Sequence, residues 1–317
     1  MRYILAYLLP LLIIIFSGNS FIKFIKKINF GQQVRDYGPE SHLKKAGIPT
    51  MGGLLIISVF IIISLLIVPK TIEVLVVLIV TFIMGLTGFL DDFLKIKLSR
   101  SLGLKAWQKV MLQLIAALIT AAAAVFILEE KGIIIPFIGS YQLGLFSKFS
   151  LTFLVVIGTS NAVNLTDGLD GLAAGVTAVV SLAFAVIFYV LGLSNYILLM
   201  LIMAGSCTAF LWFNSNPAAV FMGDVGSLAI GGFLGAAAVL SSTEIYLLII
   251  GGIYVMETLS VMIQVPYYKL SGGKRVFKMT PIHHHFELSG LAENKIVFRF
   301  IIITVILSIF ALSSVIL

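Results

Sequence analysis

Residues 72–92 read IEVLVVLIVTFIMGLTGFLDD, a run of apolar side chains that ends in two adjacent aspartates. Between Glu73 and Asp91 no residue carries a charge. A helix needs about 20 consecutive apolar residues to cross the hydrocarbon core of a bilayer. The stretch therefore predicts a transmembrane helix over 72–90, with both carboxylates at one of its ends.

The same pattern recurs throughout the 317 residues, of which 60% are hydrophobic and 11% charged, with a mean hydropathy of +1.13. A soluble domain carries about 25% charged residues, and the strands of a transmembrane barrel alternate apolar and polar residues. These values exclude a soluble, a disordered and a β-barrel protein. We expect an all-α polytopic membrane protein, a single domain over 1–317, with about ten transmembrane helices near 3–25, 51–68, 72–90, 106–128, 149–163, 172–191, 196–213, 226–241, 245–265 and 297–317.

The cationic residues predict how these helices are oriented. All but four of the 21 Lys and Arg lie in or beside the segments 23–50, 91–105, 160–171, 214–225 and 266–296, and the four exceptions are Arg2, Lys70, Lys131 and Lys148. Loops rich in Lys and Arg stay in the cytoplasm, so we expect both termini to be external. In the external loop 129–148, β-forming residues flank Gly139-Ser140, which predicts a small β-hairpin with its turn there. The single cysteine, Cys207, lies in an apolar run and is interpreted as a packing residue.

Carboxylates gather at the predicted cytoplasmic ends of the helices. Asp91 and Asp92 lie at a helix C-terminus, where the helix dipole disfavours negative charge, so a cation should compensate them. Lys95 is one candidate. Mg²⁺ is another, because it is typically held by one or two carboxylates together with substrate phosphates. The alternative is a solvated pair bridged to Lys95 and Lys97.

Two further segments are polar at helix ends. In NAVNLTDGLDG (161–171), Asn161, Asn164, Asp167 and Asp170 recur every three residues and would share one face of a helix or 3₁₀ turn. Asp224 immediately precedes a predicted helix. It could be an N-cap, or it could ligate the metal of a phosphate held at that helix start.

The C-terminal third adds a polar stripe and a histidine tract. Glu257, Ser260 and Gln264 follow helical spacing; for Glu257 we favour a structural hydrogen-bond network, whereas Gln264 could present its amide to a base or sugar. His283, His284 and His285 lie within a cationic loop, where they could bind metal adventitiously or contact phosphates. The residues alone indicate a membrane enzyme or transporter that handles a phosphorylated compound.

The ordered motifs resemble those of the phospho-N-acetylmuramoyl-pentapeptide transferase family, within the polyprenyl-phosphate N-acetylhexosamine-1-phosphate transferase superfamily. The resemblance covers essentially the whole chain, and Ile48, where the family pattern has Thr, is a departure. The matching stretches are GPESH (38–42), Lys45, PTMGG (49–53), FLDD (89–92), NAVNLTDGLDGL (161–172), FMGDVGS (221–227), MET (256–258) and PIHHHFE (281–287).

The resemblance implies a reaction in which undecaprenyl phosphate attacks the β-phosphate of UDP-N-acetylmuramoyl-pentapeptide, so that lipid I forms and UMP leaves. It also implies Mg²⁺, a homodimer, a bacterial plasma membrane location and an active site on cytoplasmic loops; no nucleic acid is expected as a partner. Two rival functions stay open: transfer of N-acetylglucosamine-1-phosphate, and transport of a phosphorylated lipid or sugar.

By the same resemblance, Asp224 is expected to ligate Mg²⁺, with Asp91 and Asp92 close by. Asp91 would deprotonate or position the lipid phosphate, and a covalent aspartyl intermediate is the rival mechanism. The remaining expected site residues are Lys95 and Lys109 for phosphates, Asn161, Asn164, Asp167, Asp170 and Gln264 for the nucleotide, His284 and His285 for the substrate, and His283 nearest the chemistry.

Overall fold

The structure is a computed structural model that describes residues 1–27, 47–98 and 103–316. The motif 38–42 and Lys45 lie outside the described residues. The described part is mostly helical, with one β-hairpin. Its elements are α1 (Arg2–Lys27), α3 (Gly53–Ile67), α4 (Ile72–Lys97), α5 (Ala106–Ala122) with a π-helical continuation η1 (Ala123–Ile127), β1 (Gly132–Ile135), β2 (Gly139–Gln142), α6 (Leu145–Thr166), α7 (Leu172–Val190), α8 (Ser194–Asn214), α9 (Gly223–Leu240), α10 (Glu244–Ile250), α11 (Gly252–Leu270), α12 (Ile282–Glu287) and α13 (Glu293–Ile316).

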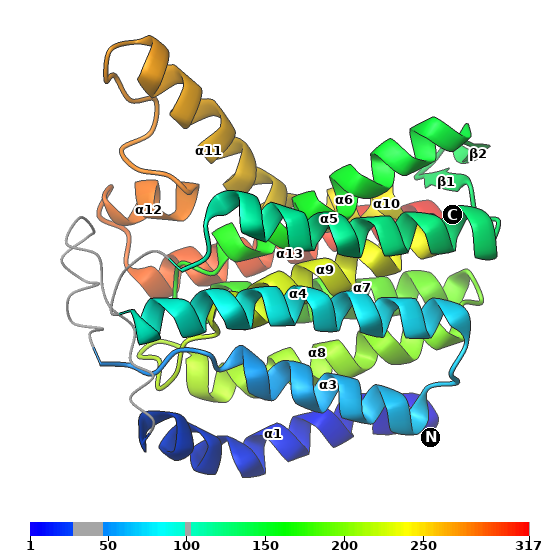
Figure 1. Ribbon diagram of the computed structural model, residues 1–317, viewed down its shortest axis with the longest axis horizontal. Coiled ribbons are helices and arrows are strands. Elements are labelled where there is room, and N and C mark those ends of the chain that lie inside the picture. Colours follow the sequence, from blue (N-terminus) through cyan, green and yellow to red (C-terminus); the bar gives the residue numbers. More distant parts are fainter. Residues whose placement is uncertain (28–46, 99–102, 317) are drawn as a thin grey trace.

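The long helices run side by side as a bundle, and both chain termini and the β-hairpin lie at one end of it (Figure 1). The opposite end, here called the site end, is formed by the last turns of α4 and α6 and the first turns of α5 and α9. Connections of a few residues, such as those between α3 and α4 or between α7 and α8, reverse the chain between neighbouring helices.

Eight described helices are long and apolar enough to span a membrane, and α10 with α11 would make a ninth. This confirms an all-α polytopic membrane protein. The predicted segment 51–68 becomes α3, whose 15 residues extend about 22 Å, less than the ~30 Å of a hydrocarbon core. All ten predicted segments are helical, but the helix over 51–68 is shorter than a full membrane span.

The predicted helix over 245–265 is broken, because α10 and α11 meet at an angle of 80°. Adjacent glycines mark the break, and a Cβ at Gly251 would lie 2.6 Å from the Leu247 carbonyl oxygen. The bend directs the C-terminal half of α11 away from the bundle, at the site end (Figure 1).

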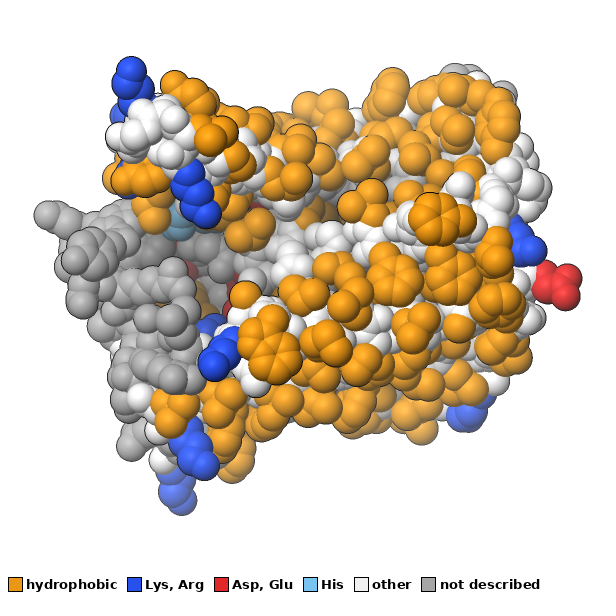
Figure 2. All heavy atoms as spheres, turned by 45° about the horizontal axis from the view of Figure 1, so that its top comes forward, with side chains coloured by type: hydrophobic (Ala, Val, Ile, Leu, Met, Phe, Trp, Pro, Cys, Tyr) orange, Lys and Arg blue, Asp and Glu red, His pale blue; other side chains and the backbone are white. Residues whose placement is uncertain are grey.

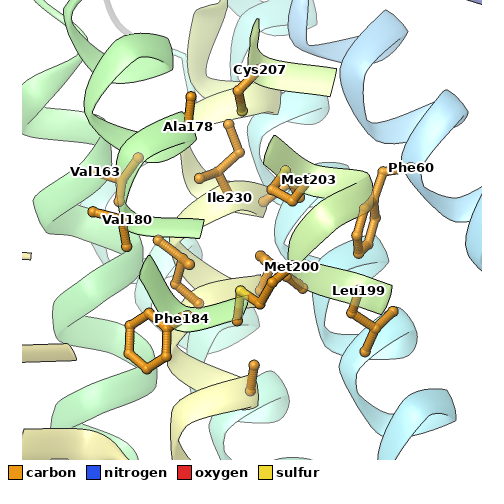
Figure 3. Close-up of a cluster of buried hydrophobic side chains, with 14 of the residues drawn as sticks. Phe60, Val163, Ala178, Val180, Phe184, Leu199, Met200, Met203, Cys207 and Ile230 are labelled. Carbon is orange, nitrogen blue, oxygen red and sulfur yellow. The ribbon is translucent and has the colours of Figure 1, made fainter. Parts of the chain in front are cut away.

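The core is built around α9, in which 89% of the residues are buried. Buried side chains from other helices, among them Phe60, Phe184, Met203 and Cys207, form one apolar cluster with Ile230 of α9 (Figure 3). Cys207 is buried as expected for a packing residue. Small residues let the helices approach closely, as is common in membranes; a Cβ on Gly53 of α3 would overlap the backbone of Gly226 in α9.

The predicted hairpin is confirmed, but its turn is displaced. Ile135 pairs with Gly139, so the turn is Pro136–Ile138 and Gly139-Ser140 belong to β2. Pro136 has no N–H to donate to a ladder, and Phe137 adopts a positive φ of 66°. These two features place the reversal three residues earlier than the Gly-Ser pair suggested.

The flank of the bundle is covered by apolar side chains, and cationic side chains lie at its two ends (Figure 2). Lys148, which the sequence placed among the external loop charges, is instead completely buried in α6. Its ammonium lies 2.6 Å from Glu244 Oε1 and donates to the Gly132 carbonyl oxygen at 2.9 Å. This ion pair joins α6, α10 and the hairpin at the end opposite the site.

Candidate active site

Three carboxylates meet at the site end. Asp91 and Asp92 come from the penultimate turns of α4, and Asp224 comes from the first turn of α9. One oxygen atom of each lies within 4.8 Å of those of the other two. We call these residues the aspartate cluster. Acidic and histidine side chains are visible in a hollow at this end (Figure 2).

Close contact between α4 and α9 fixes the aspartate cluster. A Cβ on Gly88 would overlap the backbone carbonyl of Asp224. Asp92 Oδ2 accepts a hydrogen bond of 3.2 Å from the backbone N–H of Val225, which joins the two helices one residue beyond Asp224. Gly223 has a φ of +76°, and a Cβ there would lie 2.6 Å from Asp92 Oδ2, so only glycine fits before Asp224.

Two lysines compensate the negative charge of the cluster. The Lys95 ammonium lies 2.6 Å from Asp91 Oδ2 and 3.1 Å from Asp224 Oδ2. The Lys109 ammonium, from α5, lies 3.0 Å from Asp91 Oδ1 and 2.8 Å from Asp224 Oδ2. The expectation that a cation offsets the carboxylates is confirmed, whereas Lys97 lies over the Phe93 ring instead.

The Asp224 carboxylate belongs to the aspartate cluster and does not cap α9, whose N-cap residue is Met222. Asn164 of α6 donates 3.0 Å to Asp224 Oδ1 and 2.8 Å to the Ser227 hydroxyl, which in turn donates to the Gly223 carbonyl. The amide thus orients one carboxylate oxygen, while the other contacts the two lysines.

Asp167 follows the last turn of α6, beside the cluster. Burial, together with the nearby carboxylates of Asp224 and Asp92, raises the pKa of Asp167 to about 8 from an ordinary value of 3.8, although a hydrogen bond from the Gly223 backbone opposes the rise. A carboxyl group among others of like charge holds its proton to a higher pH than an isolated carboxyl group does.

The cluster fits a divalent metal ion. It offers three hard oxygen donors on two rigid helices, and Asp224 keeps 17% of its side chain exposed, whereas Asp91 and Asp92 are nearly closed off. Carboxylate sets of this kind bind Mg²⁺, Ca²⁺ or Mn²⁺ in preference to soft metals. Asp91, Asp92 and Asp224 could therefore hold a metal ion, with the lysines beside it.

The four polar residues at 161–170 do not share one face, because α6 ends at Thr166. Asn161 forms a reciprocal amide pair with the buried Gln113 of α5, at 3.0 and 3.3 Å. The Asp170 carboxylate accepts hydrogen bonds from the Asn216 side chain and the Ala218 N–H. Only Asn164 and Asp167 of the four lie beside the aspartate cluster.

Gln264 is held by the segment that follows α11. Its amide oxygen accepts from the Val276 and Phe277 N–H groups at 2.9 and 3.0 Å, and its nitrogen donates to the Phe277 carbonyl at 2.8 Å. Next to it lies a pocket of about 240 Å³ lined by Gln264, Val265, Tyr268, Lys269, Arg275, Met279 and Thr280.

The histidine tract forms α12, and each ring has a different environment. His283 is completely buried, with its Nδ1 atom 3.0 Å from Glu257 Oε1. His284 Nδ1 lies 2.7 Å from Glu287 Oε2. His285 Nδ1 accepts a hydrogen bond of 3.1 Å from the Lys278 N–H. Glu257 therefore belongs to a buried polar contact, as the sequence favoured.

Sequence reasoning missed the partners that hold the cluster in place. The segment Thr50–Gly53 lies next to the cluster, because main-chain hydrogen bonds join it to the residues just before Asp224. Gly52 and Gly53 donate to the Phe221 and Met222 carbonyls at 2.8 Å, and the Phe221 N–H donates to the Pro49 carbonyl. The PTMGG stretch was recognised only as a motif. Ser227 was recognised only as part of the FMGDVGS motif, and Gln113 carried no local signal beyond being a polar residue within an apolar helix.

The sequence of the chain matches known protein families and relatives. A model described as glycosyl transferase family 4 matches residues 74–242, and phospho-N-acetylmuramoyl-pentapeptide-transferase signature 1 matches residues 45–57. The chain is 47% identical over 315 residues to the phospho-N-acetylmuramoyl-pentapeptide-transferase of Desulforamulus reducens, covering 97% of this chain and 94% of that protein. The chain belongs to the phospho-N-acetylmuramoyl-pentapeptide-transferase family.

Other family members agree over similar lengths. The proteins of that name from Desulforudis audaxviator and Rickettsia prowazekii are 44% and 43% identical, over 96% and 98% of this chain and 95% and 91% of theirs. The family model spans the whole aspartate cluster and Asn164, and the signature includes the Thr50–Gly53 segment, which is hydrogen-bonded to Phe221 and Met222 just before Asp224. The family match and the site geometry therefore coincide on the same residues.

Proposed function

We propose that this family member transfers phospho-N-acetylmuramoyl-pentapeptide from UDP-N-acetylmuramoyl-pentapeptide to undecaprenyl phosphate, giving lipid I and UMP. One observation carries the proposal. In a chain 47% identical to a transferase of that name, an aspartate cluster with two lysines lies at one end of a membrane bundle. A phosphoryl transfer between a soluble nucleotide and a membrane lipid needs a site that binds several phosphate groups at the membrane surface.

The metal is proposed to be Mg²⁺, held by Asp224 with Asp91 and Asp92 beside it. When bound, it would neutralise the pyrophosphate and stabilise the departing UMP. Lys95 and Lys109 carry flexible ammonium groups already gathered at the cluster, and they would turn to phosphate oxygens when the donor enters.

Asp91 is proposed to position or deprotonate the lipid phosphate. Its two oxygens are held by Lys95, by Lys109 and by the N–H of Leu104 at 2.8 Å. Two ion pairs and one hydrogen bond on a completely buried carboxylate fix its orientation. Attack by the lipid phosphate on the donor's β-phosphate needs no enzyme-bound intermediate, and the covalent aspartyl route stays the rival.

Nucleotide contacts are proposed for Asn164 and Asp167, which lie next to the cluster. Asn161 and Asp170 would contact the nucleotide only after giving up their present hydrogen-bond partners in the protein. The peptide is proposed to extend toward α11. There the pocket beside Gln264 presents Lys269 and Arg275, whose charges suit peptide carboxylates. His284 and His285 lie on the adjoining α12, and His283 lies behind them in the protein interior.

The site end is proposed to face the cytoplasm from a bacterial plasma membrane, because the Lys and Arg excess lies there. The active form is proposed to be a homodimer within the bilayer. The mass of the purified protein in nanodiscs tests whether it is a dimer, and a monomer that is fully active would refute the proposed homodimer.

The decisive experiment measures UMP release by purified protein with undecaprenyl phosphate and Mg²⁺. UDP-N-acetylmuramoyl-pentapeptide and UDP-N-acetylglucosamine are compared as donors under the same conditions. We expect a strong preference for the first. Equal or better use of UDP-N-acetylglucosamine would assign the rival transferase activity, and substrate movement across vesicles without UMP release would assign transport.

A further inference from the structure

Glu257 is a buried carboxylate that the proposed chemistry does not use. It lies in α11, beyond the 80° break that separates this helix from α10. Its side chain is completely buried. An ionisable group at such a site is costly and is usually retained for a function.

The carboxylate of Glu257 holds His283 at two points. Oε1 lies 3.0 Å from the ring Nδ1 atom, and Oε2 accepts a longer hydrogen bond of 3.4 Å from the backbone N–H of the same residue. With the carboxylate oxygen as the acceptor of this contact, the geometry assigns the ring proton to Nδ1. In the neutral ring, Nε2 is then the bare nitrogen.

The far edge of the His283 ring lies against the site. Nε2 is buried and has no hydrogen-bond partner among the described residues. A Cβ added at Gly168 would overlap this nitrogen, so the ring packs directly on the backbone of Gly168. The preceding residue is Asp167, which accepts a hydrogen bond from the Gly223 backbone beside Asp224.

The geometry points to Glu257 as a positioning residue: through the fixed ring of His283 it holds the Asp167–Gly168 segment against the start of α9. The contacts run from Glu257 to His283, from His283 to Gly168, and from Asp167 to Gly223. The bent α11 and the histidine tract thereby set where a proposed nucleotide contact lies. This inference rests on the proposed function only for the choice of the donor in the kinetic test.

The direct test reads the His283 tautomer by ¹⁵N NMR of histidine-labelled protein in nanodiscs, with His283→Asn for assignment. We expect a ring protonated at Nδ1 and bare at Nε2. In Glu257→Gln the amide can pair with either ring form, so we expect the tautomers to mix. A wild-type ring protonated only at Nε2 would overturn the inference without any need for a variant that folds or an active enzyme.

The kinetic test compares Glu257→Gln with Ser260→Ala. Ser260 lies on the same helix and donates only to the Glu257 carbonyl, so its variant controls for the packing of α11. We expect Glu257→Gln to raise the donor KM several-fold while the Mg²⁺ concentration at half-maximal rate stays unchanged, and Ser260→Ala to change neither. Equal effects of the two variants would reduce Glu257 to a packing role.

A double-mutant cycle then tests whether the contacts form one chain. Gly168→Ala adds a methyl group against the other edge of the ring, and its effect on donor KM should not add to that of Glu257→Gln, because both act through His283. Full additivity would contradict the inference. If wild-type protein releases no UMP from UDP-N-acetylmuramoyl-pentapeptide, the proposed function fails and the tautomer measurement still decides the role of Glu257.

Discussion

Gly88 of α4 lies directly against the backbone carbonyl of Asp224 in α9, with no room for a Cβ between them. The two helices thus approach closely where the aspartate cluster forms. Asp91 and Asp92 follow Gly88 within the next turn, so the same contact that packs the helices also sets the separation of the carboxylates. The stability and the activity of this site should therefore depend on one glycine.

Replacing Gly88 by alanine should damage both properties. The added methyl group would push α4 from α9, an overpacking cost of about 1–3 kcal/mol, and would spread the cluster. Gly85 provides a matched control one turn earlier, because a Cβ there would meet its nearest neighbour, Ala229 Cβ, at an ordinary 3.5 Å. We expect Gly85→Ala to be nearly neutral in thermal unfolding and UMP release. Similar behaviour of the two variants would show that the contact does not position the cluster.

Asp224→Asn tests the metal ligand. The substitution keeps the size of the side chain and can still receive the Asn164 hydrogen bond, but it removes the charge. We expect activity to fall by on the order of 100-fold or more, because even the groups that only orient metal ligands cost about 10- to 100-fold when mutated, with thermal unfolding little changed. Binding of Mn²⁺, followed by its electron paramagnetic resonance signal, should weaken in parallel. Unchanged Mn²⁺ binding would remove Asp224 from the metal site.

Lys109→Met should separate metal binding from turnover. The ammonium lies within 3.0 Å of oxygens on both Asp91 and Asp224, so it competes with a divalent cation while no donor is bound. Without it, Mn²⁺ should bind several-fold more tightly. Turnover should nevertheless fall roughly tenfold, about 1.4 kcal/mol, because a phosphate contact is lost.

Lys97→Met is the control for Lys109, since it removes the same charge from a side chain that lies over Phe93. It should leave Mn²⁺ affinity and turnover near their wild-type values. Weaker Mn²⁺ binding in Lys109→Met would mean that this lysine supports the metal and does not compete with it.

Sequence alone predicted the features that local chemistry determines. Runs of apolar residues located the helices, and the FLDD and FMGD stretches located the three aspartates. It did not predict features that depend on a tertiary partner. The pairing of Asn161 with Gln113, the burial of Lys148 by Glu244, and the enclosure of Gln264 by residues 276–277 involve residues far apart in the chain or in an irregular loop. The bend at Gly251 fell within a continuous apolar run, so residues 245–265 were predicted as one helix.

Membrane orientation can be measured with single cysteines. The one native cysteine, Cys207, is completely buried and should stay unlabelled. Ser271 follows α11 near the site end, and Ser140 lies exposed in β2 at the opposite end. A membrane-impermeant maleimide added to intact cells should label Ser140→Cys, and Ser271→Cys should react only in inverted vesicles. The opposite result would place the site end outside the cell.

Asp167 should make the metal-free protein less stable as pH rises. Burial and neighbouring carboxylates raise the pKa of Asp167 from 3.8 to about 8 in the folded chain. Between these values the unfolded chain has released the proton and the folded chain keeps it, so the free energy of unfolding falls with increasing pH and levels off above pH 8. In chelator, the wild-type melting temperature should therefore decline from pH 5 to pH 8 more than that of Asp167→Asn, whose amide does not titrate. Mg²⁺ should reduce the difference, because a cation at the cluster favours the ionised carboxyl. Parallel melting curves for the two proteins across this range would show that Asp167 ionises normally in the folded chain.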